Sequence, residues 1–339
     1  MERPIISIII PVRNEEKTIR KCLGSLFELN YPEYEVIIIN DGSTDCTKEI
    51  INSFVIRNTE FKTVTLKVID TDGIGPSKAR NAAIKQAKSD YIAFTDGDCV
   101  VDPQWLSELM KAFTHDYSHS FNAKNIVGAG GSQLSPEDDS RFGKLINDFM
   151  QVIGFATEYM KPRFVTYNKK TILKKTSHNP SCNSIYKKKV FDEIGGFSDL
   201  WPGEDVDLDY RITKAGYYLM YNPAAMVCHY RIDNIQDFRK MMYSYGKVQA
   251  MLVKSYGLFR KIQYVPIVLF LGISAEILFL ILKLKFGIIL FITTNLLLLL
   301  YFFTRTKGLL KTLSYFWLFF EVLFQWNFGF IKEMLNKRK

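Results

Sequence analysis

The segment Asp90–Asp102, DYIAFTDGDCVVD, joins a short apolar run to closely spaced acids. The run Tyr91–Phe94 has the composition of a buried strand, and Asp96-Gly97-Asp98 follows it almost at once. Because a carboxylate is costly to bury alone, acids at the end of a core strand usually lie at its mouth and bind something positive. Two carboxylates separated by a glycine can both approach Mg²⁺ or Mn²⁺, whose other ligands are commonly phosphate oxygens. The alternative is a glycine turn in which the aspartates only cap the backbone.

A second acidic group, Glu204–Asp209, has four acids in six residues and follows Trp201-Pro202-Gly203. An aspartate held at the start of a helix could take the proton of a hydroxyl group as a general base. Acids at this position also complement the helix dipole without any catalytic role. The aromatic-Pro-Gly turn before them favours a shaped pocket.

Alternating strand and helix patterns must position these acids. The expected strands are Ile5–Ile10, Glu35–Ile39, Val64–Ile69 and Tyr91–Thr95, and the expected helices are Glu15–Leu29, Ser43–Ile56, Pro76–Lys88 and Pro103–Phe113. Repeated βα units predict an α/β fold with a Rossmann-like, mostly parallel sheet and helices on both faces.

The pattern is looser in the following hundred residues. A helix is expected over Arg141–Met160 and another over Glu204–Ala215, and Arg163–Asn179 is basic and irregular. Short strands are expected at Asn183–Tyr186, Tyr217–Tyr221 and Met226–His229.

Polar residues follow each of the first four predicted strands. These groups are Pro11–Glu16, Asn40–Asp45, Gly73–Pro76 with Arg80-Asn81, and Asp96–Asp98. In an open parallel sheet, ligands bind beyond the carboxyl ends of the strands. The sequence therefore predicts that these residues meet at one edge of the sheet and form the site.

The net charge of +9 is concentrated toward the C-terminus, where residues 262–339 contain nine Lys and Arg against three acids. This excess lies beside apolar segments, so membrane-flanking charge is a better explanation than a nucleic-acid footprint. Ile262–Leu282, Phe286–Phe303 and Thr312–Ile331 are each about long enough to cross a bilayer, with a buried helical core as the alternative. Three crossings from the cytosol would place the basic tail Lys332–Lys339 outside, against the positive-inside tendency. Two to three membrane helices are therefore expected, and an interfacial or re-entrant third segment stays open.

Three regions follow from these patterns: a domain over 1–230, basic amphipathic juxtamembrane helices over 231–261, and a membrane region over 262–339. Arg231–Lys261, with seven Lys and Arg against two Asp, has the composition of an interfacial helix pair, or of an ordinary solvated helix. The N-terminus has no signal-peptide pattern. Five widely spaced cysteines without CxxC fit a reducing compartment and predict neither a zinc site nor a disulfide framework. An integral membrane protein with a cytoplasmic catalytic domain is expected.

The order of several motifs gives a resemblance. PVRNEE, NDGSTDCT, GPSKARNAAI, TDGD, GGF, GEDVDLDYR and the Cys228-His229 pair follow one another along the chain. From about Ile5 to His229, the chain resembles family 2 glycosyltransferases of the GT-A fold. Each motif alone is weak, and their joint order carries the resemblance.

The resemblance implies roles for individual residues. Nucleotide-sugar binding is expected of Pro11, Arg13, Asn14, Glu15, Asp41, Arg80, Asp96, Gly97 and Trp201. Metal binding, with Mg²⁺ or Mn²⁺ as cofactor, is expected of Asp98, Asp96 and His229. Asp205 would be the catalytic base, and Glu204 would orient it or touch the sugar. For His229 a packed or surface histidine remains the alternative, and for Trp201 a core or lid-anchoring tryptophan.

The resemblance further implies inverting transfer from a UDP- or GDP-type sugar donor. Processive polysaccharide synthases similar to this family carry QxxRW, whereas Gln236–Lys240 reads QDFRK here. Transfer of a single sugar to a lipid-linked or glycan acceptor at the membrane is therefore favoured, with membrane lipids as partners and no nucleic acid. The alternatives are a polysaccharide synthase component and a non-catalytic, nucleotide-binding membrane scaffold. A nucleotidyltransferase is disfavoured, because PVRNEE is not the Gly-rich basic loop that such enzymes carry after their first strand.

Overall fold

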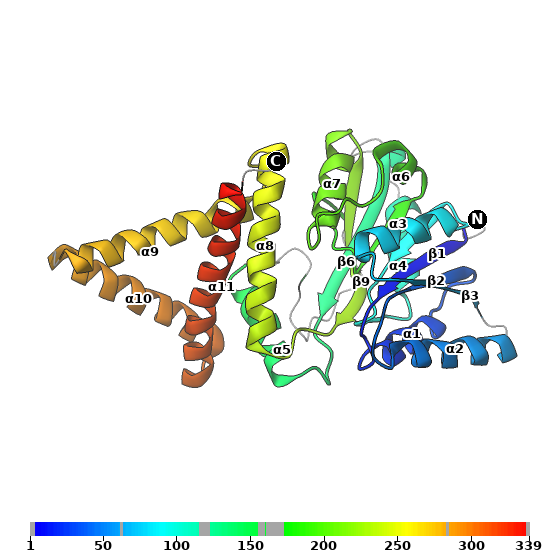
Figure 1. Ribbon diagram of the computed structural model, residues 1–339, viewed down its shortest axis with the longest axis horizontal. Helices are drawn as coiled ribbons and strands as arrows, with labels where there is room; N and C mark the ends of the chain where they lie inside the picture. The colour runs from blue at the N-terminus through cyan, green and yellow to red at the C-terminus, as the bar shows by residue number, and fades with distance from the viewer. Residues whose placement is uncertain are drawn as a thin grey trace. The chain divides into compact units, whose positions relative to one another are not determined.

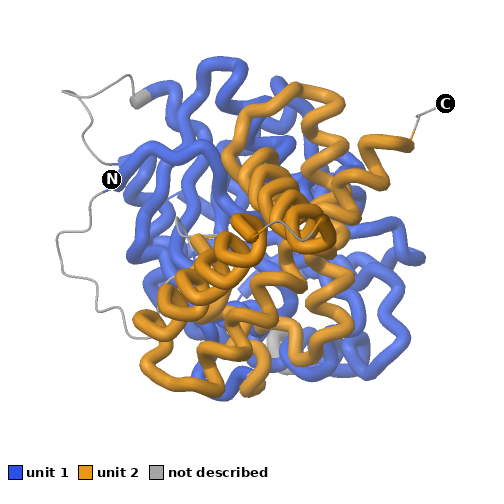
Figure 2. The backbone as a smooth tube through the Cα atoms, turned by 90° about the vertical axis from the view of Figure 1, so that its left-hand side faces the viewer, with its two compact units in different colours: residues 1–139, 157–230 blue, residues 140–156, 231–339 orange. Residues whose placement is uncertain are grey.

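The computed structural model describes residues 4–61, 64–114, 123–154, 160, 173–282 and 285–336. The chain forms two compact units, one of residues 1–139 and 157–230 and one of residues 140–156 and 231–339 (Figure 2). Residues 140–156 thus belong with the C-terminal helices, although the sequence-based limits left them in the first domain. The irregular stretch expected at 163–179 lies mostly outside the described residues.

Within the described residues the first unit contains a nine-stranded sheet, in the order β3-β2-β1-β4-β8-β6-β9-β5 with β7 on β9 (Figure 1). The strands are β1 (Ile6–Val12), β2 (Tyr34–Asp41), β3 (Thr65–Thr71), β4 (Tyr91–Phe94), β5 (Cys99–Val101), β6 (Ile126–Leu134), β7 (Lys174–Thr176), β8 (Ser184–Lys187) and β9 (Tyr218–His229). The strands β1 to β4, β6 and β9 run in one direction, and β5, β7 and β8 run against them. The predicted α/β class and mostly parallel sheet are confirmed.

Alternation along the strands explains why helices cover both faces of this sheet. Ile8 and Ile10 of β1 pack with α1 (Ile19–Phe27), α2 (Thr47–Phe61) and α4 (Trp105–Thr114), whereas Ile9 packs on the other face. The helices of that second face are α3 (Pro76–Gln86), α6 (Lys189–Ile194) and α7 (Glu204–Lys214). Successive side chains of a strand point to opposite faces, so a continuous apolar strand is buried on both.

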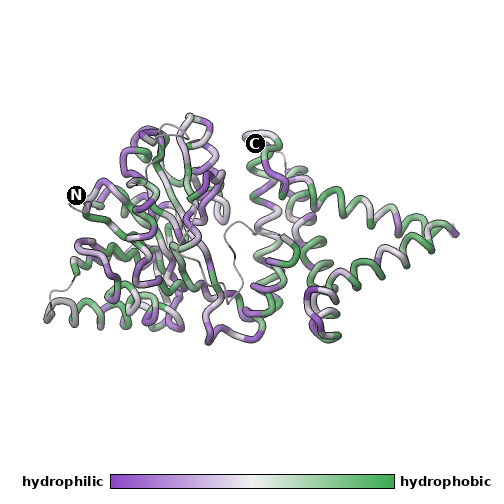
Figure 3. The backbone as a smooth tube through the Cα atoms, turned by 180° about the vertical axis from the view of Figure 1, so that it is seen from behind, coloured by the Kyte–Doolittle hydropathy of each residue, from purple (hydrophilic) through white to green (hydrophobic). Residues whose placement is uncertain are grey.

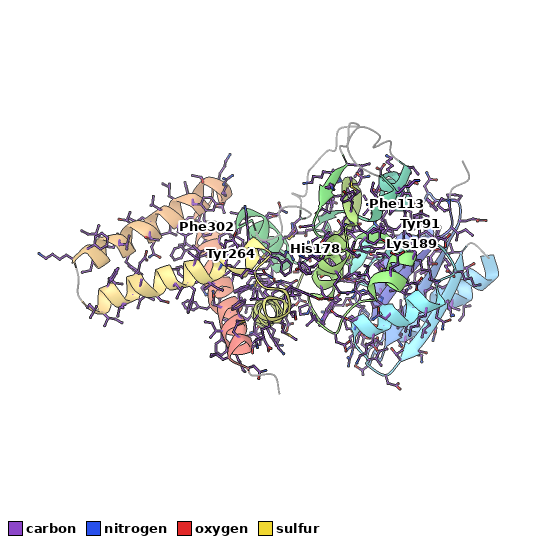
Figure 4. All side chains as sticks on the ribbon, turned by 90° about the horizontal axis from the view of Figure 1, so that it is seen from above. Tyr91, Phe113, His178, Lys189, Tyr264 and Phe302 are labelled. Atoms are coloured by element: carbon purple, nitrogen blue, oxygen red, sulfur yellow. The ribbon has the colours of Figure 1, made fainter. Side chains whose placement is uncertain are left out.

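One detail of this unit differs from the sequence prediction. The strands expected at 217–221 and 226–229 form one strand, β9, whose register with β6 shifts between Gly131 and Ser132. The shift loops out the residues around Pro223, which lacks an N–H for the ladder. At the start of β4, Tyr91 makes an edge-to-face pair with Phe113 of α4, with ring centroids 5.1 Å apart (Figure 4).

The second unit is helical in its described residues. Its elements are α5 (Arg141–Val152), α8 (Ile235–Tyr256), a 3₁₀ turn at Lys261–Gln263, α9 (Val265–Ile281), α10 (Lys285–Thr306) and α11 (Leu309–Leu335). A Cβ added at Gly246 of α8 would collide with the Trp326 carbonyl oxygen of α11, and one at Gly329 with that of Tyr243. The backbones of α8 and α11 therefore cross in close contact. The basic stretch forms one long helix here, where a helix pair was expected.

Two helices of this unit are long and apolar enough to cross a membrane. The segments Lys261–Ile281 and Lys285–Thr306 each reach a mean hydropathy of 2.3, with little of either buried (Figure 3). No other described helix passes the same test, α11 included. One polar contact joins the two, since the Thr294 hydroxyl donates to the Glu276 carboxylate at 2.8 Å.

Candidate active site

The loops after β1 and β2 are tied together at the carboxyl edge of the sheet. Asn14 has a left-handed backbone, with φ of 57°, and its side-chain oxygen accepts a hydrogen bond from the Thr44 N–H at 2.8 Å. The Glu15 N–H donates to the Thr47 hydroxyl at 2.7 Å. Short polar side chains tolerate this backbone better than bulky ones do. The PVRNEE and NDGSTDCT motifs thus form one surface.

Asp41 ends β2 and organises the loop after β3. Its carboxylate accepts hydrogen bonds from the Thr71 hydroxyl and from the N–H groups of Ile74 and Gly75, at 2.6, 2.7 and 2.8 Å. Burial raises the pKa of Asp41, but these three bonds and the nearby Arg13 outweigh burial and lower it. The carboxylate is therefore ionised at neutral pH.

Arg80 of α3 lies at the centre of the site and joins two acids from different elements. It is fully buried and donates to Asp96 and to Glu204, both at 2.7 Å. Burial lowers the pKa of Arg80, but the two carboxylates offset burial and raise it, so the guanidinium stays charged. Burial raises the pKa of Asp96 although Arg80 opposes the change. Removing one partner of such a buried ion network costs about 3–5 kcal/mol, because the other charges remain buried.

Glu204, the first residue of α7, is the most deeply buried acid of the site. Burial, with the neighbouring Asp205 charge, raises its pKa to about 8 despite the Arg80 contact. One oxygen accepts from Arg80, and the other, Oε2, has no hydrogen-bond partner within the described residues. A buried oxygen without a partner is unfavourable, so this atom is suited to form a hydrogen bond with a bound ligand, as donor when the carboxyl is protonated and as acceptor when it is ionised.

The stability of the chain should consequently depend on Glu204 between pH 4.5 and pH 8. The folded-state pKa is raised, so the folded chain keeps a proton that the unfolded chain loses; the stability is full below pH 4.5 and is lost as the pH rises through 8. Glu204→Gln should reduce the fall in the free energy of unfolding over this window by an amount on the order of a few kcal/mol, measured by denaturant unfolding at a series of pH values. The exposed Glu33→Gln is the matched control. An unchanged slope in Glu204→Gln would show that Glu204 does not hold this proton.

Asp98, in the turn between β4 and β5, lies next to His229 at the end of β9. The Nε2 atom of His229 lies 3.2 Å from Asp98 Oδ2, and its Nδ1 lies 3.3 Å from Gln133 Oε1. A Cβ at Gly97 would lie 2.8 Å from Val12 and 3.1 Å from Glu15, so the turn between the two aspartates has no room for a side chain. The glycine is required here for space.

The carboxylates of Glu15 and Asp98 repel each other at this position. Burial and the Asp98 charge raise the pKa of Glu15 to about 7, although the Thr18 hydroxyl bond and His229 oppose the change. Like charges raise carboxylate pKa values, and a bound cation removes that penalty. Carboxylate oxygens with one imidazole nitrogen suit a hard divalent ion such as Mg²⁺ or Mn²⁺. The residues present therefore fit the expected metal.

Asp205 follows Glu204 in the first turn of α7. Its carboxylate accepts hydrogen bonds from the Val206 N–H at 2.7 Å and the Ser181 N–H at 3.2 Å, and its side chain is 18% exposed. The acid is thus oriented by two backbone donors and still reaches solvent. Trp201 is 54% exposed, with its ring centre 5.8 Å from the Arg80 guanidinium carbon. Trp201 is therefore not a core residue.

A buried polar network behind Asp205 was not anticipated from the sequence. Asp209 accepts hydrogen bonds from the Asn179 N–H at 2.6 Å and the Tyr186 hydroxyl at 2.8 Å, and its Oδ2 lies 3.0 Å from His178 Nδ1. The network fixes the segment that delivers Ser181 to Asp205. The four acids of Glu204–Asp209 were recognised in the sequence, but the partners of Asp209 are distant in the chain, so the network could not be predicted.

The structure brings most of the expected site residues to this edge. Asp96, Arg80 and Glu204 form one linked group, Asp98 and His229 a second, and Asn14 and Glu15 belong to the loop beside them. Pro11 is buried within β1, and the side chain of Arg13 is exposed beside Gly73. Gln133, His178 and Cys182 were missed, because none belongs to a local motif.

The sheet, its helices and the acids at its edge define the GT-A glycosyltransferase fold. A mannosyltransferase from Pyrobaculum calidifontis, solved with GDP-Man and Mn²⁺, matches with a TM-score of 0.69 and 14% identity, over 99% of this chain and 89% of that one. This likeness concerns the fold.

The family follows from the sequence comparison. A family model for glycosyl transferase family 2 matches residues 7–195, more than half of the 339-residue chain. The chain belongs to glycosyl transferase family 2.

Two curated relatives match over comparable lengths. Glycosyltransferase AglE of Haloferax volcanii is 30% identical over 67% of this chain and 67% of its own length. A dolichyl N-acetyl-alpha-D-glucosaminyl phosphate 3-beta-D-2,3-diacetamido-2,3-dideoxy-beta-D-glucuronosyltransferase of Methanococcus voltae is 25% identical over 74% of each chain. Other relatives are longer: the chain spans about half of the poly-beta-1,6-N-acetyl-D-glucosamine synthase of Staphylococcus epidermidis, with 27% identity over 65% of this chain and 48% of that one.

Proposed function

We propose that the chain is a membrane-anchored, inverting glycosyltransferase that transfers a single sugar from a nucleotide-diphospho-sugar to a lipid-linked or membrane-proximal acceptor. The observation that carries this proposal is the meeting of two groups at one edge of the sheet. The Asp98–His229 pair, 3.2 Å apart, is suited to a metal and diphosphate, and the Arg80–Glu204 pair, 2.7 Å apart, adjoins the solvent-accessible Asp205.

The nucleotide would bind along the loops after β1 to β3. Pro11, Arg13, Asn14 and Glu15 supply one wall, and Asp41 holds the facing loop through its bonds to Ile74 and Gly75. This arrangement supports a UDP- or GDP-type donor without choosing between them.

The diphosphate would lie beside Asp96, Asp98 and His229. These residues would hold Mg²⁺ or Mn²⁺, which when bound stabilises the negative charge of the leaving diphosphate. Arg80 keeps Asp96 in place through the 2.7 Å bond, so the turn Asp96-Gly97-Asp98 is held in one orientation. Gly97 allows the close approach to the loop that carries Glu15.

Asp205 is proposed as the general base. Its orientation by the Val206 and Ser181 N–H groups leaves carboxylate lone pairs for the proton of an acceptor hydroxyl. The deprotonated hydroxyl would attack the anomeric carbon on the face opposite the leaving diphosphate, which inverts that centre. Glu204 Oε2 would bind a sugar hydroxyl, and the exposed Trp201 would stack on a sugar face.

The helical unit supports a membrane-proximal acceptor. α9 and α10 would anchor the chain in the bilayer, and the basic Arg231–Lys261 stretch would attract anionic headgroups on the cytoplasmic side. The name of the Methanococcus voltae relative includes a dolichyl-phosphate-linked sugar acceptor, which supports a lipid-linked acceptor here.

A polysaccharide synthase component is the second candidate, favoured by the poly-N-acetylglucosamine synthase relatives. Against it, Lys240 occupies the place of the QxxRW tryptophan. Arg239, the arginine of that stretch, is engaged by Glu321 of α11, with its Nε 2.8 Å from Oε2. The length of the glycan product separates the two candidates. A non-catalytic scaffold would bind donor and transfer nothing.

The proposed function predicts metal-dependent stabilisation by one class of donor. The full chain in detergent is heated with each of a panel of UDP-, GDP- and other nucleotide-sugars, in Mn²⁺ or in EDTA. A ligand at about a hundred times its Kd stabilises the native state by about 2.7 kcal/mol, which raises the unfolding midpoint by several degrees. We expect such a rise with one nucleotide class in Mn²⁺ and none in EDTA. No rise with any donor, in folded protein, would contradict the proposal.

A further inference from the structure

Two cysteines outside the oxygen-rich site lie close to His229 and to each other. Cys99 starts β5, His229 ends β9 directly opposite it in the ladder, and Cys182 belongs to the loop between β7 and β8. One ligand atom from each of these residues lies within 4.8 Å of the other two. The Cys182 Sγ to His229 Nδ1 distance is 3.8 Å.

We propose that Cys99, Cys182 and His229 form a second metal site, for a thiophilic divalent cation such as Zn²⁺ or Cd²⁺, which shares His229 with the catalytic edge. Tetrahedral Zn²⁺ with Zn–S bonds of about 2.3 Å places two sulfurs about 3.8 Å apart, so the existing spacing needs only side-chain adjustment. Each thiol loses its proton to solvent on binding. Two thiolates and a dication then have no net charge, which makes their burial inexpensive.

The ligand types separate this site from the one proposed for Mg²⁺ or Mn²⁺. Soft thiolates select zinc-like ions, whereas carboxylate oxygens such as those of Asp96 and Asp98 select hard ones. The Gln133 Oε1 atom, 3.3 Å from His229 Nδ1, could supply a fourth ligand. A buried pair of small hydrophobic cysteines is the alternative account.

The orientation of His229 favours this site. Its Nε2 faces Asp98 at 3.2 Å, while its Nδ1 faces Cys182. A metal-bound histidine usually donates its other N–H to a carboxylate, and this bond fixes the ring. Asp98 is placed to accept that bond from Nε2, and Nδ1, which lies 3.8 Å from Cys182 Sγ and 3.3 Å from Gln133 Oε1, would then bind the cation.

The cysteine loop is held rigidly enough to keep a preformed site. The Asn183 side chain accepts a bond from the buried Trp105 ring N–H at 2.8 Å and donates to the carbonyls of Ser132 and Ala225, both at 2.9 Å. Cys182 precedes this anchor directly and is 4% exposed. Fixed ligands lose little freedom on metal binding.

Occupation of this site should oppose donor binding, a step that rests on the proposed function. With the soft ion on Nδ1, His229 must keep its proton on Nε2 and bond Asp98. His229 then offers no lone pair to the metal–diphosphate group, and the hydrogen bond occupies one Asp98 oxygen. The soft cation would therefore act as an inhibitor through the shared histidine.

The test uses the reduced, metal-free full chain in detergent, titrated with Cd²⁺ alone and followed by the ultraviolet thiolate-to-cadmium charge-transfer band. We expect saturation at one ion per chain and at least tenfold weaker binding in both Cys182→Ser and Cys99→Ser. Cys228→Ser, next to His229 but on the opposite face of β9, and the exposed Cys46→Ser should bind as the natural chain does. The absence of a thiolate band, or unchanged Cd²⁺ affinity in Cys182→Ser, would overturn the site.

A second arm tests the coupling. Cd²⁺ loading should weaken the apparent affinity for the donor, measured from the thermal shift in Mn²⁺, at least tenfold. The loss of affinity should be far smaller in Cys182→Ser. A full donor shift in the Cd²⁺-loaded chain would overturn the coupling while leaving the site in place. If the unloaded chain shows no donor shift, the proposed function fails and the Cd²⁺ titration still decides the site.

Discussion

Asp205→Asn should reduce kcat by roughly 10²–10⁴-fold, the usual contribution of a general base, and leave donor affinity unchanged. Asparagine has nearly the same shape, and its side-chain oxygen still accepts the Val206 N–H bond that orients Asp205. What it lacks is the ability to accept the proton of the acceptor hydroxyl. Transfer is measured with radiolabelled donor and a lipid-linked acceptor, and donor binding is measured by thermal shift.

The matched control is Asp199→Asn. Asp199 lies shortly before α7, and its side chain is 69% exposed in a loose contact with Lys78. The control should keep normal turnover. Near-normal kcat in Asp205→Asn would show that another group takes the proton.

Asp98→Ala should abolish transfer by another route, through the loss of metal-dependent donor binding. The alanine removes the carboxylate that faces His229 Nε2 at 3.2 Å. Donor affinity in Mn²⁺ should fall at least tenfold, which is about 1.4 kcal/mol, and the difference between Mn²⁺ and EDTA should vanish. Asp96 and Glu15 would lose a neighbouring negative charge, so the variant should remain folded.

Asp90→Ala provides the comparison, because Asp90 is exposed at the opposite end of β4. It should retain the Mn²⁺-dependent donor shift. Retention of that shift in Asp98→Ala would assign the metal to other residues. Together with Asp205→Asn, this variant separates loss of binding from loss of chemistry.

The first half of the sheet was predictable from the sequence, because its strands are continuous β-branched runs with helices of regular spacing between them. Ile6, Ile8 and Ile10 are fully buried on one face and Ile9 on the other, as such a run requires. The antiparallel β5 was not predicted. It has three residues, and its place depends on the ladder with His229, a contact across 130 residues that no local pattern encodes.

The residues of the candidate site also divide into those that the sequence predicts and those that it does not. Asp41, Asp96, Asp98 and Asp205 lie in local motifs that mark strand ends or a helix start. The cysteine–histidine group was excluded by the absence of CxxC, yet the fold assembles it from three separate segments. Spacing rules detect ligands contributed by one loop, whereas a sheet edge collects them from several strands.

The pair of helices α9 and α10 bears on whether the chain crosses the membrane an even or an odd number of times. α8 precedes α9 and α11 follows α10, and α8 and α11 pack backbone to backbone at Gly246 and Gly329. If α9 and α10 both cross a bilayer, as proposed, the chain returns to the side it left. The basic residues before α9, such as Arg260 and Lys261, and those after α10, such as Lys307 and Lys311, would then share that side, whereas Lys283 and Lys285 between the two helices would lie opposite.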